Sequence, residues 1–189
     1  MTPGLGHNLG PSLEPGQSWR AHCWTRARQD LLPKLPIEVV RNRLRRAAEI
    51  GLDYRTYATV RASTGRDIVA FLFSTNALRL FRADQAMEQL RKDKLAGLRG
   101  CKRTGLAIAP LTPQAVLRGR SDVLDGVAAA PHVHATWSDA ARAMDAARGA
   151  GLPADGVILV GDTAMERDWS QAGRLAGYLD AARFFTPPA

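Results

Sequence analysis

The chain has 189 residues and a mass of 20.5 kDa; 46% of its residues are hydrophobic and 23% are charged. This length and composition suit one globular domain with a sizeable buried core. No apolar run approaches the roughly 20 residues that a membrane-spanning helix needs, and the first residues lack the basic start and apolar stretch of an export signal. The two cysteines, Cys23 and Cys101, are too few for a disulfide framework. We therefore expect a soluble, cytoplasmic protein with no membrane association.

Positive charge is concentrated in the first half of the chain. The net charge is +8, and residues 1–103 carry 19 Lys and Arg against 9 Asp and Glu, whereas residues 104–189 carry 7 against 9. Such an asymmetry indicates contact with nucleic acid or another polyanion. The alternative is a solvated basic surface that only keeps the protein soluble.

The N-terminal region divides into a tail and a basic helical segment. Residues 1–17 are rich in Gly and Pro and lack apolar periodicity, which predicts a flexible tail. Residues 18–65 predict three helices, the first beginning at Ser18 and ending before Pro33, and the third covering 54–62. The second helix has an apolar stripe that we expect to face the core, formed by Ile37, Val40, Leu44, Ala47 and Ala48.

The arginines of this segment are the first candidate binding residues. In the second helix they fall outside the apolar stripe, so we expect them on its solvent side. Arginine side chains in that position can contact phosphates without reading the base sequence. The same face could instead bind an acidic protein. The predicted polyanion-binding residues are Arg20, Arg26, Arg28, Arg41, Arg43, Arg45 and Arg46.

Residues 66–189 alternate between apolar runs and amphipathic segments. The run at 68–73 is typical of a strand buried on both faces, although a buried helix through Leu80 fits the same pattern. Further strands are expected at 104–109, 133–137 and 157–161, with helices at 83–98, from Ser138 to Arg148, and after Thr163. The alternation predicts an α/β fold in which the N-terminal helical segment packs on a small, mainly parallel sheet of three or four strands.

Polar residues follow two of the predicted strands. Ser74, Thr75 and Asn76 come after the first, and Asp162 and Thr163 come after the last. Open α/β sheets bind ligands beyond the carboxyl ends of their strands, where helix N-termini also favour anions. As an alternative to polyanion binding, these five residues predict a crevice for a small phosphorylated ligand.

The segment from Val160 to Asp168, followed by Ala172-Gly173, resembles the fourth motif of haloacid-dehalogenase-like hydrolases. In that family, acidic residues after a strand hold Mg²⁺, so the resemblance implies Asp162 with Glu166 or Asp168 as metal ligands. The family also has an Asp-x-Asp nucleophile pair after its first strand, which this sequence lacks. We therefore expect no hydrolase activity of that type. Thr163-x-x-Glu166 is equally a helix capping box.

Other catalytic and cofactor motifs are absent from the sequence. It has no phosphate-binding glycine loop and no G-x-S-x-G turn, and His132 and His134 are too few for a zinc site. We expect no metal and no cofactor, and the absence of these motifs argues against an enzyme.

Three stretches, Gly6-His-Asn-x-Gly-Pro11, Ser18-Trp-Arg-x-His-x-Trp24 and 65–77, resemble a small family of bacterial proteins that has no assigned function. That resemblance implies a soluble bacterial protein and no particular chemistry. The sequence thus predicts a basic protein that binds nucleic acid or another polyanion through its arginine-rich helices. A small-ligand protein and a protein-interaction module are the alternatives.

Overall fold

The computed structural model describes residues 35–186. The predicted tail at 1–17, the first predicted helix, and Arg20, Arg26 and Arg28 lie outside the described residues. The described chain from Arg41 onward belongs to one compact unit, and residues 35–40 belong to a separate N-terminal unit.

Five parallel strands form the centre of the fold, in the order β3-β2-β1-β4-β5. Their bounds are β1 (Ala70–Ser74), β2 (Lys102–Ala107), β3 (Gly126–Ala129), β4 (Val157–Gly161) and β5 (Gly177–Asp180). Every residue of β1 is buried, as expected for a strand covered on both faces. The α/β class and the parallel sheet are confirmed, and the segment at 70–74 is a strand rather than a helix. The sheet has five strands instead of the predicted three or four.

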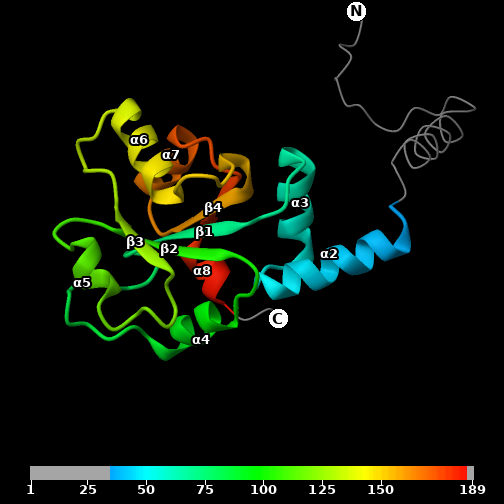
Figure 1. The fold of residues 1–189 in the computed structure, drawn as a ribbon, viewed down its shortest axis with the longest axis horizontal. Helices are drawn as coiled ribbons and strands as arrows, with labels where there is room; N and C mark the ends of the chain where they lie inside the picture. Colours follow the sequence, from blue (N-terminus) through cyan, green and yellow to red (C-terminus); the bar gives the residue numbers. More distant parts are fainter. Residues whose placement is uncertain (1–34, 187–189) are drawn as a thin grey trace, which may run out of the picture. The chain divides into compact units, whose positions relative to one another are not determined.

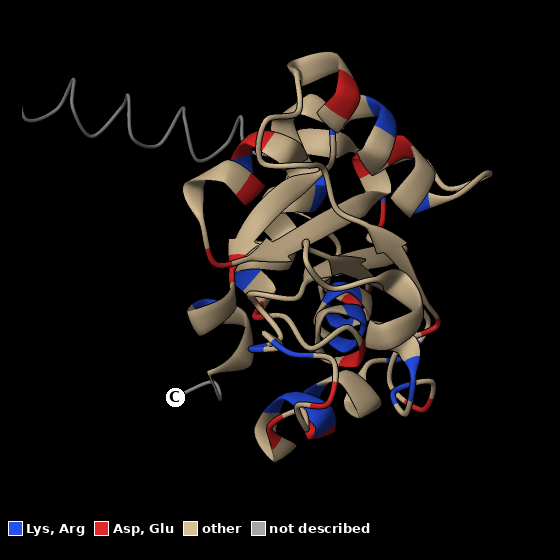
Figure 2. Ribbon diagram, turned by 90° about the vertical axis from the view of Figure 1, so that its left-hand side faces the viewer, with Lys and Arg blue, Asp and Glu red and all other residues tan. Residues whose placement is uncertain are grey.

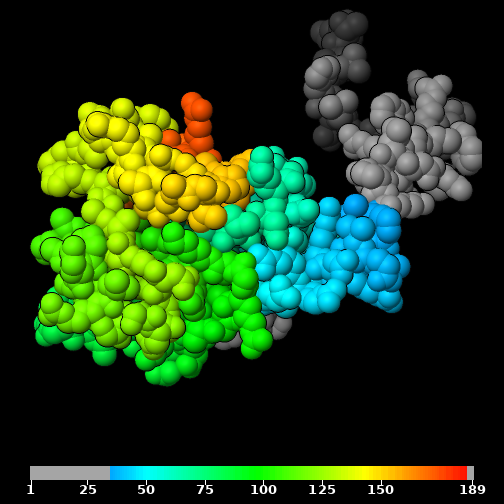
Figure 3. Space-filling view, in the orientation of Figure 1, coloured from blue at the N-terminus to red at the C-terminus, as the bar shows by residue number. Residues whose placement is uncertain are grey.

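Helices cover both faces of this sheet. The helices of the described chain are α2 (Ile37–Glu49), α3 (Tyr54–Thr64), α4 (Gln89–Gly97), α5 (Pro113–Leu117), α6 (Trp137–Arg148), α7 (Ala164–Ala172) and α8 (Ala181–Phe185), with a 3₁₀ turn η1 at Ala154–Gly156. Helices α6 and α7 lie on one face, and α4, α5 and α8 lie on the other (Figure 1). The space-filling view shows the region of α6 in yellow and the segments around α4 and α5 in green (Figure 3).

The two layers enclose two hydrophobic clusters, because alternate strand residues point to opposite faces. On the α8 side, the ring of Phe184 lies 5.5 Å from the rings of both Phe71 and Phe73. On the other side, Leu72 lies in a cluster with Met144 of α6 and Trp169 of α7. The sheet is therefore fixed from both faces by side chains of β1.

The edges of the sheet differ from the prediction. Residues 133–137 were expected to form a strand, but they form a loop that enters α6, and Val133 and Trp137 are 62% and 59% exposed. The strand lies instead at 126–129, and β5 was not predicted. Both edge strands have four residues and only partial burial, so they lack the long apolar run that marks a buried strand.

The predicted apolar stripe of the second helix is also wrong over most of its length. Ile37 is 63% exposed and Leu44 is 48% exposed, whereas Ala47 is buried. Helix α2 contributes to the hydrophobic cluster only at its C-terminal end, through Ala47 and the following Ile50.

Helix α4 begins at Gln89, six residues later than predicted at 83. The preceding loop is held by Gln85, whose side chain accepts a hydrogen bond from the backbone N–H of Phe81 at 2.9 Å and donates one to the carbonyl of Arg79 at 2.7 Å. Side-chain bonds of this kind offer the backbone an alternative to helix formation.

Candidate functional site

The carboxyl ends of β1 and β4 lie side by side at the point where the strand order reverses. From β1, the chain adds β2 and β3 on one side of the sheet and β4 and β5 on the other. Phe73 pairs with Val160, so Ser74 and Gly161 end neighbouring strands. Open α/β sheets bind their ligands at this switch point. The structure thus brings together the two segments predicted to line a crevice.

The first of these segments is engaged in local hydrogen bonds. The hydroxyl of Ser74 accepts a bond from the backbone N–H of Ala77 at 3.0 Å, and the hydroxyl of Thr75 accepts one from that of Ile108 at 3.3 Å. Both side chains are buried. Ser74 and Thr75 therefore fix the loops beyond β1 and β2.

Glu166 is the central residue of the switch point, and it is fully buried. One carboxylate oxygen accepts the backbone N–H groups of Asp162 and Thr163, at 2.6 and 2.9 Å. The other accepts the side-chain amide of Asn76 at 3.1 Å. The capping box is present, because the hydroxyl of Thr163 accepts the backbone N–H of Glu166. The link between Asn76 and Glu166 joins the loop after β1 to helix α7.

Gly161 makes room for this carboxylate. A Cβ atom at position 161 would lie 2.8 Å from Oε2 of Glu166 and 2.7 Å from a ring carbon of Tyr178. Half-buried Tyr178 has its pKa raised to about 12, chiefly by desolvation and then by the charge of Glu166. The glycine, the tyrosine and the carboxylate thus form one packed unit.

This arrangement does not suit a metal ion at Glu166, because three N–H donors already surround its carboxylate. Asp162 lies 3.6 Å from the guanidinium of Arg79, and Asp168 is exposed. Within residues 35–186, no group of three or more His, Cys, Asp or Glu side chains could hold a metal. The segment that follows β1, Ser74-Thr75-Asn76, contains no carboxylate.

The N-terminus of α7 also has little to offer a phosphate. Helix N-termini attract anions, but here Glu166 already supplies the anion and Asp162 adds a second carboxylate beside it. A phosphorylated ligand at Ser74, Asn76 and Asp162 is therefore less favoured than the sequence alone suggested.

The arginines of helix α2 present a different surface. Arg41 and Arg45 are exposed and stand one turn apart on the same side of the helix, while Arg43 is half-buried and points to another side. Arg45 donates a hydrogen bond to Asn42, and Arg43 has no polar partner within the described part of the chain. These three arginines therefore lie on two sides of the helix.

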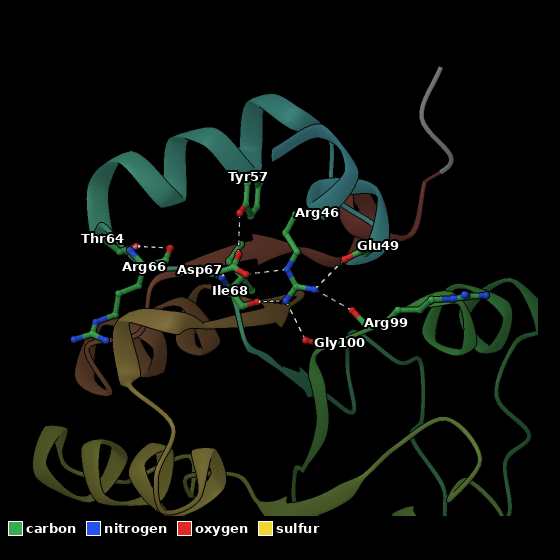
Figure 4. Close-up of polar contacts among 9 residues, drawn as sticks. All are labelled: Arg46, Glu49, Tyr57, Thr64, Arg66, Asp67, Ile68, Arg99 and Gly100. Atoms are coloured by element: carbon green, nitrogen blue, oxygen red, sulfur yellow. Dashed lines mark hydrogen bonds and ion pairs between the residues drawn. The ribbon is translucent and has the colours of Figure 1, made fainter. Parts of the chain in front are cut away.

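Arg46 was predicted to belong to this surface, and the structure corrects that prediction. Its Nε donates to the carboxylate of Asp67 at 2.9 Å, and its Nη2 donates to the carbonyls of Ile68 and Gly100 at 2.9 and 3.0 Å (Figure 4). The side chain is only 18% exposed. It lies at the end of α2 that joins the core, so it reaches backbone carbonyls rather than solvent. Arg46 therefore connects α2 to the start of β1 and to the turn before β2.

Charged residues elsewhere are interspersed on the helices and loops, and the strands are almost free of them (Figure 2). Many of the cations lie beside carboxylates, as in the pairs Arg66–Asp155, Lys92–Asp122 and Arg103–Asp125. The hydrogen bond from Arg103 is the main cause of the lowered pKa of Asp125. Helix α2 differs in carrying four arginines within six residues, Arg41, Arg43, Arg45 and Arg46, of which Arg46 is bound to the fold.

Sequence reasoning missed two features of these sites. One is the bond between Asn76 and Glu166, which joins residues 90 positions apart. The other is the role of Arg46, whose partner Asp67 is 21 positions away. Strand order could have predicted that the loops meet, but only packing determines which side chains touch.

Comparisons of the chain with protein-family models, with curated proteins and with solved structures gave no match. In the described part of the chain, no helix combines the length and the apolar character needed to cross a membrane. The function must therefore be inferred from this chain's own residues.

Proposed function

We propose that the protein is a non-enzymatic polyanion-binding protein whose helix α2 contacts nucleic acid without sequence preference. The observation that carries this proposal is the presence of three arginines within five residues, Arg41, Arg43 and Arg45, on a helix where carboxylates are few. The charge asymmetry of the whole chain supports the same proposal.

The proposal predicts how strongly the affinity for nucleic acid falls as the salt concentration rises. Each phosphate contact releases condensed counterions, and the log–log slope of affinity against salt is about −0.9 per contact on duplex DNA. Three contacts predict a slope of about −2.7, which corresponds to a loss of about 40-fold in affinity between 50 and 200 mM salt. Contacts of arginines with phosphates position a protein on a nucleic acid without reading its base sequence.

The test is a fluorescence-anisotropy titration of labelled DNA and RNA oligomers at several salt concentrations. Replacing Arg41, Arg43 and Arg45 with Ala should weaken binding to all sequences alike and flatten the salt slope. A control variant with the same loss of charge replaces exposed Arg82, Arg118 and Arg142, and it should retain most of the affinity. Flat anisotropy up to about 50 µM protein at roughly 50 mM salt would exclude the proposal.

A second candidate, an acidic protein partner, is favoured by the exposed apolar side chains of the same helix. Ile37 and Leu44 lie among the arginines and are more than 45% exposed. Protein interfaces combine an apolar centre with a polar rim, whereas phosphate contacts need no such side chains. This candidate predicts no retention on nucleic acid at physiological salt. It also predicts that Leu44→Ser weakens partner binding as strongly as the loss of an arginine.

A further inference from the structure

A cavity of about 740 Å³ opens between the α2–α3 turn, helix α4, strand β5 and helix α8. Its apolar walls include Leu52, Leu179 and Phe184. The volume falls within the roughly 300–1,000 Å³ of small-molecule sites, which are mostly apolar with a few polar groups. Neither the three arginines of α2 nor the switch-point residues line it. The cavity is thus a separate feature of the molecule.

Lys94 is the cation of this cavity that has no counter-ion among residues 35–186. Its ammonium group donates a hydrogen bond to the carbonyl of Gly51 at 2.8 Å and lies 5.3 Å from the centre of the Phe184 ring. Within the described chain, no carboxylate lies within ion-pair distance of it. Burial lowers the pKa of Lys94, as expected for a charge placed against apolar walls. An ammonium group has three N–H donors. Among the described residues, that of Lys94 has one acceptor, the carbonyl of Gly51.

Glycine at position 51 allows Lys94 to take this position. Gly51 has a φ of +67°, and a Cβ atom there would lie 3.1 Å from Cε of Lys94 and 2.8 Å from the side chain of Leu98. The lysine therefore crosses close to the turn and reaches the cavity wall.

The other charges in the cavity balance each other. Arg183 donates to the hydroxyl of Thr56 at 2.5 Å and lies 3.5 Å from the carboxylate of Asp53. Asp53 also accepts the backbone N–H of Thr56 at the start of α3. The Asp53–Arg183 pair contributes no net charge. The lining of the cavity therefore has a net charge of +1, which is carried by Lys94 beside apolar walls.

We propose that this cavity binds an amphipathic monoanion, namely a carboxylate with an apolar body. The carboxylate pairs with Nζ of Lys94, and the apolar body packs on Leu52, Leu179 and Phe184. A charge-assisted hydrogen bond to a carboxylate replaces the missing counter-ion, while burial of the apolar body supplies affinity without further polar contacts. If Lys94 served only to cap the C-terminal end of α2, the cavity would not distinguish an anion from a neutral molecule of the same shape.

The experiment compares two fluorescent probes, 1-pyrenebutyrate and 1-pyrenebutanol, which differ in one charged group, on the full-length protein. The wild-type protein should bind the carboxylate about tenfold more tightly than the alcohol. Lys94→Met should remove this preference and leave the affinity for the alcohol unchanged. Lys92→Met is the matched control, because Lys92 lies on the same helix and pairs with Asp122 outside the cavity lining.

A second variant tests the location. Ala182 is exposed and lines the cavity, so Ala182→Trp should fill the space and weaken both probes without disturbing the core. Equal affinity of the two probes for the wild-type protein would overturn the proposal. A preference that survives Lys94→Met, or undiminished binding to Ala182→Trp, would overturn it as well.

Discussion

Replacing Arg46 with Ala is expected to lower the free energy of unfolding by about 2–3 kcal/mol. Exposed ion pairs contribute about 0–1 kcal/mol, whereas breaking a buried pair costs about 3–5 kcal/mol. The side chain of Arg46 is 18% exposed and that of Asp67 is 36% exposed, so solvent screens part of the interaction. Asp67 keeps two donors after the substitution, Tyr57 and the N–H of Ile68. The carbonyls of Ile68 and Gly100 lose theirs.

The assay is urea unfolding followed by circular dichroism, with thermal melting as a second measurement. At about 2–4 °C per kcal/mol for a chain of this size, the midpoint should fall by about 4–12 °C. Arg46→Lys should recover less than half of the loss, because an ammonium cannot reproduce the guanidinium fork. Arg45→Ala, one position away, should stay within about 0.5 kcal/mol of wild type. If Arg46→Ala also stays within that range, the bonds of Arg46 contribute no net stability and the reasoning is refuted.

Two further predictions concern Glu166 and Cys101. Glu166→Gln should destabilise the protein by about 1–3 kcal/mol in urea unfolding, because an amide nitrogen would face N–H donors in a buried site. The control Asp168→Asn, at an exposed position, should have almost no effect. Equal effects of the two substitutions would contradict the stabilising role of the Glu166 carboxylate. Burial raises the pKa of Cys101 to about 11 from an ordinary value of 9. A Cys23→Ser variant leaves Cys101 as the one thiol of the chain. Its alkylation by iodoacetamide, which needs the thiolate, should be slow at pH 8 and should become faster up to about pH 11. Since the folded pKa lies above the unfolded one, the stability contributed by the neutral thiol is complete below pH 9 and is lost as the pH rises towards 11; an alkylation rate that is constant between pH 8 and 10 would contradict this.

The buried centre of the sheet could be predicted from the sequence, and its edges could not. Strand β4 lies at 157–161 as expected, because a fully apolar run bounded by glycines is typical of a strand that is buried on both faces of an α/β sheet. Strand β3 has the sequence Gly-Val-Ala-Ala, which buries too little apolar surface to stand out. Val133 and Trp137 gave a stronger apolar signal although they face solvent.

In the candidate sites, contacts between residues close in the sequence could be predicted, whereas contacts between distant residues could not. Thr163 and Glu166 form the capping box that their spacing indicated, because both partners lie within one helical turn. The four neighbouring arginines of α2 looked alike in the sequence, yet Arg46 is bound to the fold by groups up to 54 positions away. The Lys94 cavity was not predicted, because four separate elements line it and no short motif reports their meeting.

The carboxylate at the start of α7 has a consequence for competition. Glu166 is a tethered anion that never diffuses away from the N–H groups of Asp162 and Thr163. Tethering gives a group an effective concentration in the millimolar range or far above it, so a free metabolite with the same charge starts at a disadvantage. At the switch point of this sheet, the backbone N–H groups that could attract a free anion are therefore already occupied by a side chain of the same protein. Replacing Glu166 with a small neutral residue would free these N–H groups and would also remove the capping box at the start of α7.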